Sequence, residues 1–456
     1  MAGNVSLTGL TSDINWTNLI NDIINAKKSA TITPLENKKT NYQSKLSAYQ
    51  SFNSLLLSLK NYIDDNDLDT QTGYAIYSSS LTSSNSSITP ENVLGVTLGS
   101  VSGAGSYSIE VLNLAQAEKI ASDSQTSKTE ALGLSGTVNI NGEDITIESD
   151  DTLTLIASKI NNANVGVTAS ILSISDTEHR LIIESQTTGA EGITLTDDND
   201  VLKTLGILDS VGLKKNIIRS GADASVKIDG YDITSTTNTL TDVISGVTLT
   251  LKDTNSGSPI TLAITENTGA ISGKVSALVS SINSVLNYVK TQNTYSGNSS
   301  STPLMGDINL HTVRNNIIDA IFAEVSGNTT YKTASSIGFT FASDGTLSLN
   351  STTFSEALSS NKQEVINVLT QFGDTLKTSM NVYVDPYTGT LTSVEKSINQ
   401  TISDIDKRIE ELNERYEREA EVLEKKYNSL ELLISSSNLM KNWLTQQIDY
   451  MKKSNS

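Results

Sequence analysis

The sequence lacks cysteine altogether and is poor in histidine and in aromatic residues. The absence of cysteine among 456 residues excludes disulfide bonds and thiolate metal sites. The two histidines, His179 and His311, lie far apart, and we interpret each as a surface or hairpin residue rather than a catalyst. Aromatic residues make up 5% of the chain, which predicts modest cores in several small domains. We expect no cofactor, no metal ion and no enzymatic activity.

Basic residues and long apolar runs are scarce as well. The net charge of −19 argues against binding to nucleic acid or to anionic membranes, because both need clustered lysine and arginine. No apolar run approaches the roughly 20 residues of a membrane-spanning helix, so we expect no membrane insertion. The N-terminus has no basic residue before Lys27 and no apolar core segment, so we expect no cleavable signal peptide.

One acidic segment matches a calcium loop only at its start. Asp65, Asp67 and Asp69 have the spacing of an EF-hand, but Thr70 and Ile76 stand where that loop needs glycine and glutamate. We interpret the segment as a solvated acidic turn. The serines form no Gly-x-Ser-x-Gly elbow, while a glycosidase pair among the scattered carboxylates stays an open alternative.

Near the C-terminus the apolar residues follow a helical repeat. They are three or four residues apart, and an extra step of four between Tyr416 and Ala420 indicates a stutter. Such a stripe must be buried against another helix, in this chain or a neighbouring one. The stripe consists of Ile398, Ile402, Ile405, Ile409, Leu412, Tyr416, Ala420, Leu423, Tyr427, Leu430 and Ile434. On the charged face we predict the ion pairs Glu411–Arg415, Glu414–Arg418 and Glu421–Lys425.

Two apolar stretches near the N-terminus have the same spacing. The longer one runs from residue 42 to 63, and a shorter one from 14 to 24. We expect Pro34 to break the two helices apart, because proline disfavours helical conformation at the residue before it. The two ends of the chain are expected to pair as an intramolecular coiled coil.

Between these ends the sequence is rich in serine, threonine and asparagine and contains an internal repeat. Residues 138–146 match residues 226–234, each with an Asx-Gly pair between short β-prone runs. A type I′ turn at Asn141-Gly142 would pair Val138 with Ile145 and keep the apolar residues on one face. The same turn at residues 229–230 would pair residues 226 and 233.

The spacing of the apolar residues and the positions of turn-forming residues predict the remaining helices and strands. We expect strands at 93–98 and 107–111, joined as a hairpin through Gly103 and Gly105, and strands at 165–174, 181–185, 247–251 and 260–264. Helices are expected around 155–160, 271–289, 309–322, 354–358 and 364–372, the last ended by Gly373 as its C-cap. A hairpin of 337–341 and 347–349 requires a three-residue loop with Gly345 in the left-handed conformation.

Several motifs, in their order along the chain, resemble the flagellar filament cap family, also called hook-associated protein 2. Gly9-Leu10-Thr11-Ser12 is similar to the start of the family's Gly-Leu-x-Ser-Gly-Leu-Asp signature, although Asp13 and Asn15 stand where glycine and aspartate are usual. The other matching segments are 107–117, which ends in Leu-Ala-Gln-Ala, the Asx-Gly repeat with 160–169, and 246–251, 304–307, 337–338 and 344–349. The resemblance covers essentially the whole length.

The resemblance implies a structural cap at the distal tip of the bacterial flagellum, outside the cell, that promotes folding and insertion of exported flagellin. It implies three partners: further copies in a closed ring of about five or six subunits, flagellin, and an export chaperone at the C-terminal helix. A subunit exported unfolded needs neither cysteine nor a cleavable signal.

The predicted fold class is α+β and multidomain, with N- and C-terminal coiled-coil helices enclosing nested, inserted β-rich domains. The predicted parts are a flexible helical segment at 1–40, a helical leg domain from 41–70 and 272–420, an inner β-rich plate domain from 71–130 and 216–271, an outer inserted β-rich domain at 131–215, and a helical segment at 421–456. The residues predicted to contact other copies or flagellin are Leu10, Ile14, Leu19, Ile23, Leu46, Leu56, Ile398, Ile402, Ile405, Ile409, Leu412, Leu423 and Leu430.

Two other classes share part of this pattern. A flagellin-like or junction filament subunit would have helical ends and β insertions, but the Asx-Gly repeat together with the sequence motif Gly-Val-Thr-Leu-Thr-Leu at 246–251 favours the cap. A cell-surface adhesin would share the Ser/Thr-rich strands and the acidic charge, but it would not need apolar stripes at both termini.

Overall fold

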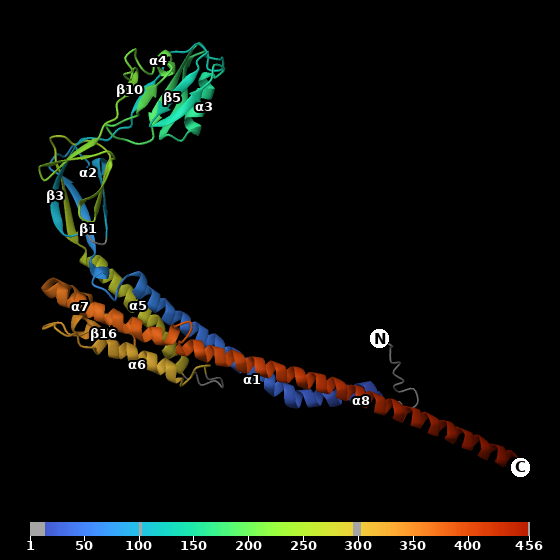
Figure 1. Cartoon of the computed structure of the whole chain (residues 1–456). Helices are drawn as coiled ribbons and strands as arrows, with labels where there is room; N and C mark the ends of the chain where they lie inside the picture. The colour runs from blue at the N-terminus through green and yellow to red at the C-terminus, as the bar shows by residue number, and fades with distance from the viewer. Residues whose placement is uncertain (1–13, 100–102, 295–301, 455–456) are drawn as a thin grey trace. The chain divides into compact units, whose positions relative to one another are not determined.

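The computed structural model describes residues 14–99, 103–294 and 302–454. The chain divides into two compact units, a helical one from 1–71 and 272–456 and a β-rich one from 72–271 (Figure 1). The two ends of the chain therefore build one unit, and the middle of the chain is inserted between them. The α+β class, with helical ends that enclose β-rich parts, is confirmed.

The helical unit is built around two long antiparallel helices. They are α1 (Trp16–Asp65) and α8 (Thr390–Ser454), which lie side by side in Figure 1. The other elements are α5 (Thr268–Asn293), which begins at the end of the β-rich unit, α6 (Ile308–Phe322), η2 (Ala334–Ile337), β16 (Phe339–Phe341), β17 (Leu347–Leu349) and α7 (Ser351–Val384).

The expected helix break at Pro34 is wrong. Helix α1 continues through Pro34 as one helix of 50 residues. Residues on both sides of the proline are covered, because Ile32 belongs to an apolar cluster formed by α1 and α8, and Leu35 packs against that cluster. A proline inside a helix costs about 3 kcal/mol, and burial of the apolar stripe on both sides offsets that cost.

The expected ending of a helix at Gly373 is also wrong. The two helices predicted at 354–358 and 364–372 form the single element α7, in which Asn361 alone leaves the helical region, with φ −152° and ψ 81°. Gly373 lies inside α7, where a Cβ atom would lie 2.2 Å from the carbonyl oxygen of Leu68. The glycine allows α7 to approach the main chain that follows α1.

The predicted three-residue hairpin loop is confirmed. Phe341 pairs with Leu347, and the amide of Ala342 donates to the carbonyl of Thr346 at 2.8 Å, which leaves residues 343–345 as the loop. Gly345 has φ +85°, the left-handed conformation that this loop requires.

The inner part of the β-rich unit has two sheets around one core. The sheets have the orders β1-β15-β3-β11-β12 and β13-β14-β2, and both contribute to a core that includes Ile109, Val226, Leu249 and Leu262. The elements are η1 (Thr72–Tyr74), β1 (Tyr77–Ser83), α2 (Pro90–Val93), β2 (Leu94–Leu98), β3 (Gly105–Asn113), β11 (Ala224–Ile228), β12 (Tyr231–Ser235), β13 (Thr239–Ile244), β14 (Val247–Leu251) and β15 (Ile260–Glu266).

The expected hairpin through Gly103 and Gly105 is wrong. Strand β2 pairs with β14, whereas β3 pairs with β15 and β11 in the other sheet. Val93, expected in the strand, ends the short helix α2. The shared core explains the difference, because each strand buries its apolar face there from a different sheet and finds its partners far along the chain.

The outer part of the β-rich unit has a separate apolar core. Two sheets, β10-β4-β8-β7 and β6-β5-β9, surround residues such as Ile140, Ile156, Leu181 and Ile207. The elements are β4 (Lys119–Ala121), β5 (Gly136–Ile140), β6 (Glu143–Ile147), α3 (Leu153–Asn162), β7 (Val167–Ser175), β8 (Glu178–Ser185), β9 (Leu195–Asp197), α4 (Val201–Thr204) and β10 (Ile217–Arg219). The exact boundaries of the five predicted parts stay a prediction.

Both Asx-Gly hairpins form as predicted. Val138 pairs with Ile145, and Asn141 and Gly142 have φ +52° and +92°. In the second copy, residues 226 and 233 pair, and residues 229 and 230 have φ +50° and +90°. Positive φ at both central positions is the signature of the type I′ turn.

Candidate functional site: the paired terminal helices

The terminal helices α1 and α8 form a continuous apolar seam. The part of the seam that involves the N-terminal half of α1 is called the distal seam here. It contains a small cluster of five buried residues that is separate from the cores of the β-rich unit: Ile20, Ile24, Ile32, Leu412 and Tyr416. The ring of Trp16 stacks on that of Tyr427 with centroids 4.7 Å apart, and the hydroxyls of Thr31 and Tyr416 lie 2.8 Å apart. The predicted intramolecular coiled coil is therefore present.

Most predicted contact residues of α8 face this seam. Ile398, Ile405 and Leu412 are buried, and Ile402, Ile409 and Leu423 are half-buried. Leu430 is 39% exposed, because it lies at the end of the stretch that α1 covers. Whether any of these residues contacts another protein stays a prediction.

The predicted contact residues of α1 divide differently. Leu56 is buried, Leu46 and Ile23 are half-buried, and Ile14 and Leu19 are 42% and 39% exposed. Leu10 lies outside the described residues. The seam instead uses residues that we did not single out as contacts, namely Trp16, Ile20, Ile24 and Ile32. The step of four from Trp16 to Ile20 to Ile24 was the signal that identifies this face.

Ion pairs across and along the helices differ from those predicted. Lys27 pairs with Glu419, and Lys39 with Asp406 at 2.6 Å, so both pairs join α1 to α8. Along α8, Glu414 pairs with Arg418 at 3.4 Å as predicted, but Glu411 pairs with Arg408 at 2.8 Å rather than with Arg415. In the described part of the chain Glu421 and Lys425 form no ion pair. One of the three predicted pairs is therefore present, and the pairs that join the two helices use other residues.

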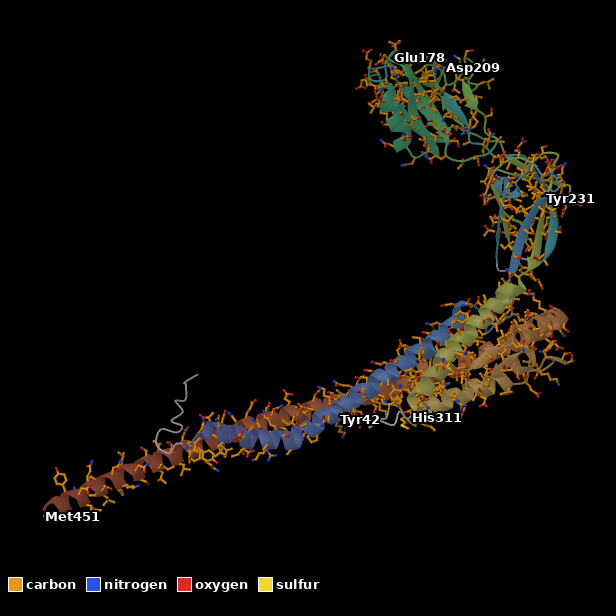
Figure 2. All side chains as sticks on the ribbon, turned by 180° about the vertical axis from the view of Figure 1, so that it is seen from behind. Tyr42, Glu178, Asp209, Tyr231, His311 and Met451 are labelled. Atoms are coloured by element: carbon orange, nitrogen blue, oxygen red, sulfur yellow. The ribbon has the colours of Figure 1, made fainter. Side chains whose placement is uncertain are left out.

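Beyond the seam, α8 presents apolar side chains to solvent. Glu431 closes the seam, because it is buried and accepts a hydrogen bond from the indole N–H of Trp16 at 2.8 Å. After it, α8 continues towards Met451, which marks the far end of the helix in Figure 2. The exposed apolar residues of this stretch are Leu432, Leu433, Leu439, Met440, Trp443, Leu444, Ile448, Tyr450 and Met451.

The expected solvated acidic turn after α1 is present at Asp65 and Asp67, which are exposed, but Asp69 joins an ion-pair network. The ammonium of Lys377 lies 2.7 Å from Asp64 and 2.6 Å from Asp69, and these hydrogen bonds raise the pKa of Lys377. Burial by itself would raise the pKa of Asp64, but the hydrogen bonds from Lys377 and Lys60 lower it. The acidic turn is thereby tied to α7.

A second carboxylate, Glu364 on α7, holds the loop that precedes η2. It accepts hydrogen bonds from the backbone amides of Tyr331, Thr329 and Thr330, each at 2.9 Å, and from the hydroxyl of Thr329 at 2.8 Å. These donors favour the charged form and lower the pKa of Glu364 to about 2. The arrangement is structural, since every donor belongs to the same loop.

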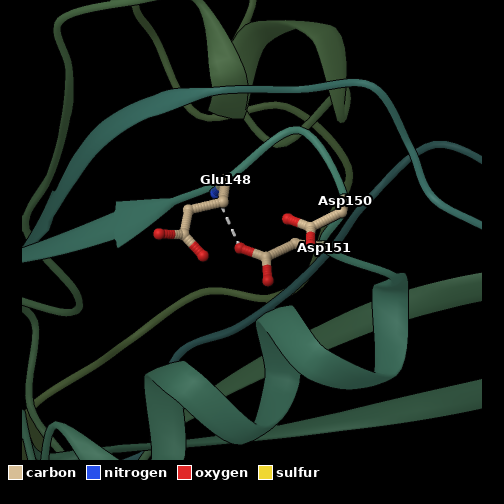
Figure 3. Close-up of side chains that lie close together, drawn as sticks. All are labelled: Glu148, Asp150 and Asp151. Atoms are coloured by element: carbon tan, nitrogen blue, oxygen red, sulfur yellow. Dashed lines mark hydrogen bonds between the residues drawn. The ribbon is translucent and has the colours of Figure 1, made fainter.

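The acidic cluster of the outer β-rich part consists of Glu148, Asp150 and Asp151 (Figure 3). The ammonium of Lys159 lies 2.6 Å from the buried carboxylate of Asp151 and 3.6 Å from that of Glu148. The hydrogen bond to Asp151 raises the pKa of Lys159. Lysine supplies the positive charge at this position, so we assign the cluster to the anchoring of α3.

Within the described residues, no helix combines the length and the apolar character that crossing a membrane requires.

Comparison with known proteins gives consistent similarities. The family models "Flagellar hook-associated protein 2 N-terminus" and "Flagellar hook-associated protein 2 C-terminus" match residues 12–118 and 221–439. Flagellar hook-associated protein 2 of Escherichia coli K12 is 26% identical, and the match covers 98% of each chain. The B-type flagellar hook-associated protein 2 of Pseudomonas aeruginosa is 25% identical over 92% of each chain. The crystal structure of the D1-D2-D3 domains of the Escherichia coli flagellar cap protein FliD superimposes with a TM-score of 0.65 at 25% identity, over 77% of this chain and 99% of that chain.

Proposed function

Because this chain belongs to the flagellar hook-associated protein 2 family, we propose that it caps the distal tip of the bacterial flagellar filament, where it promotes folding and insertion of exported flagellin. Proteins of this family lie at the filament tip outside the cell. The observation that carries the proposal is the end-to-end similarity to cap proteins, which spans 98% of the chain. Neither the flagellin-like subunit nor the adhesin is favoured by these relatives.

The terminal helices support a mechanism of reversible engagement. The distal seam depends on a small cluster of five buried residues, so its opening need not unfold the rest of the helical unit. The apolar stretch of α8 after Glu431 has no cover from α1. An amphipathic segment of this kind gains order only when a partner covers its apolar side chains, which allows it to engage and release as the filament grows.

Three partners belong to the proposal. Further copies of the chain form the cap as a closed ring of about five or six subunits, flagellin binds beneath it, and an export chaperone covers the C-terminal helix before assembly. The exposed apolar residues of 432–451 support the chaperone contact, because they need protection from water before the cap is built. The absence of enzymatic activity and the five predicted domain parts belong to the same proposal.

Charge substitutions in the seam test the mechanism. We expect Ile405→Asp or Leu412→Asp to abolish capping and motility when the full-length protein replaces the cap of a flagellated bacterium, because a carboxylate in the seam costs several kcal/mol of helix association. The β-rich unit should remain folded, as measured by circular dichroism. Ser403→Asp is the matched control, since Ser403 is exposed on the same helix and is not a predicted contact residue. Normal motility with either seam variant would show that the seam is not the functional contact.

Negative-stain microscopy tests the assembly. Full-length protein should give closed rings, or rings joined through their ends, and a chain lacking residues 1–40 and 420–456 should lose the joined forms. Open filaments would instead support a flagellin-like subunit.

A further inference from the structure

A cleft on the helical unit collects basic side chains, although the chain as a whole is acidic. The cleft lies between α5, α6 and the loop of the β16–β17 hairpin and has a volume of about 330 Å³. Figure 2 labels His311, which belongs to it. The chain has 51 acidic and 32 basic residues, so three basic side chains beside one carboxylate run against its overall balance. The side chains that matter here are Lys290, His311, Arg314, Asp344, Leu286 and Val289.

The elements around the cleft are held in place by hydrogen bonds. The side-chain amide of Asn283 on α5 donates to the carbonyl of Leu347 and accepts from its amide, both at 2.7 Å, which fixes the hairpin to α5. Helix α6 is capped by Asp307, whose carboxylate accepts from the amide of Asn309 at 2.9 Å and from the hydroxyl of Tyr49 on α1. The cleft is therefore preformed, as ligand sites usually are.

The chain itself neutralises only part of the positive charge. The ammonium of Lys290 lies 3.6 Å from the carboxylate of Asp344, which already accepts from the amide and the hydroxyl of Thr346 at 3.1 and 2.7 Å. Within the residues that the structure describes, the side chains of His311 and Arg314 form neither an ion pair nor a hydrogen bond. Residues 295–301, which connect α5 to α6, contain no carboxylate. The guanidinium and the imidazole thus face the cleft without an anion.

The charge and the apolar part of the lining favour a carboxylate. Lys290 and Arg314 contribute two positive charges and Asp344 one negative charge, so with neutral His311 the net charge of the cleft is +1. One carboxylate balances this charge, whereas a phosphate dianion would leave a negative charge beside Asp344. A guanidinium also binds a carboxylate through two parallel hydrogen bonds. Apolar contact adds to the attraction when the carboxylate is carried by methylene groups.

We propose that this cleft binds one acidic side chain, glutamate or aspartate, from a segment of a different protein. The carboxylate lies between Arg314 and His311, and its methylene groups contact Leu286 and Val289. A second copy of this chain is disfavoured as the occupant, because two chains of charge −19 repel each other and one small cleft offers little to offset that repulsion. The inference goes beyond the proposed cap function and does not depend on it.

The presence of only two histidines gives a site-specific measurement with an internal control. Full-length protein labelled with ¹³C in histidine has one ring signal from His311 in the cleft and one from His179 on β8, and His311→Gln assigns them. The probe is the capped peptide acetyl-Ala-Leu-Glu-Leu-Ala-amide, and its control has glutamine in place of glutamate. We expect the glutamate peptide to shift the His311 signal saturably and to leave the His179 signal in place. The glutamine peptide should shift neither signal.

Matched charge removals separate a carboxylate site from general attraction by the surface. Arg314→Gln should weaken binding of the glutamate peptide about tenfold, because it removes a charge-assisted pair. Lys407→Gln removes the same charge from an exposed position on α8 outside the cleft and should leave binding unchanged. Circular dichroism should show that both variants remain folded, since both side chains are exposed.

Three results would overturn the proposal. Equal shifts from the two peptides would show that the carboxylate is not recognised. Displacement of the glutamate peptide by an equal concentration of inorganic phosphate would show that the cleft prefers a dianion. A His311 signal that moves when the protein alone is diluted, and that no longer moves in Arg314→Gln, would show that a second copy occupies the cleft. Capping is measured separately by motility, so none of these results changes the standing of the proposed function.

Discussion

Alanine substitutions at two glycines of the helical unit are expected to change its stability in opposite directions. Gly373 lies in α7 and Gly273 in α5. A Cβ atom at Gly373 would lie 2.2 Å from the carbonyl oxygen of Leu68 and 3.2 Å from the amide nitrogen of Asp69, whereas one at Gly273 would meet nothing within 4 Å. We expect Gly373→Ala to destabilise the helical unit and Gly273→Ala to stabilise it.

The magnitudes follow from helix propensity and steric overlap. Alanine is favoured over glycine inside a helix by about 0.8–1 kcal/mol. This difference in helix propensity favours both substitutions. At Gly373 the overlap is with main-chain atoms, so α7 or the chain after α1 has to shift, and such overpacking costs about 1–3 kcal/mol or more. The shift would also move Lys377 away from Asp64 and Asp69, which it contacts at 2.7 and 2.6 Å. We expect a net loss of about 1–3 kcal/mol for Gly373→Ala and a gain of about 0.5–1 kcal/mol for Gly273→Ala.

Urea and thermal unfolding of the full-length protein, followed by far-UV circular dichroism, measure both effects. For a unit of this size, 1 kcal/mol corresponds to a shift in Tm of about 2–4 °C. A Gly373→Ala variant that gains stability as Gly273→Ala does would refute the close approach of α7 to the main chain at Leu68. A loss at both positions would instead refute the helix-propensity argument.

Three further predictions follow from individual contacts. Because the pKa of Glu364 is lowered from 4.5 to about 2, its stabilisation is present above pH 4.5 and lost as the pH falls towards 2. The difference in unfolding free energy between wild type and Glu364→Gln should therefore narrow as the pH falls across this window. Gly142→Ala should cost about 1–2 kcal/mol because Gly142 has φ +92°, and Gly103→Ala, which meets nothing within 4 Å, should be close to neutral in the same unfolding assay. Leu412→Ala should cost about 2–5 kcal/mol of stability in the distal seam and speed hydrogen exchange of residues 16–40 more than tenfold. Leu430→Ala should leave this exchange rate unchanged. Equal exchange rates in the two variants would show that the seam is open in solution.

Elements whose cause is local could be predicted from the residues alone. A repeat of three and four specifies the apolar stripe of α8, because residues at that spacing share one face of a helix. The two Asx-Gly pairs specify type I′ turns, because those residues tolerate the positive φ that both central positions need. Gly345 and its three-residue loop follow from the same reasoning, since the phase of the flanking apolar residues excludes a shorter loop.

Features that depend on partners far along the chain could not be predicted in this way. By local preference, Pro34 and Gly373 both predict the end of a helix. Pro34 stays inside α1 because its neighbours are buried against α8, and Gly373 stays inside α7, where the helix closely approaches Leu68. Strands β2 and β3 are neighbours in sequence but belong to different sheets, because a common core between the sheets outweighs a short connection. Along α1, spacing alone allows either Leu19 and Ile23 or Ile20 and Ile24 to face a partner, and only the position of α8 selects the second pair. Local preferences fix the conformation of a segment, but which of its faces is buried is a property of the surface opposite.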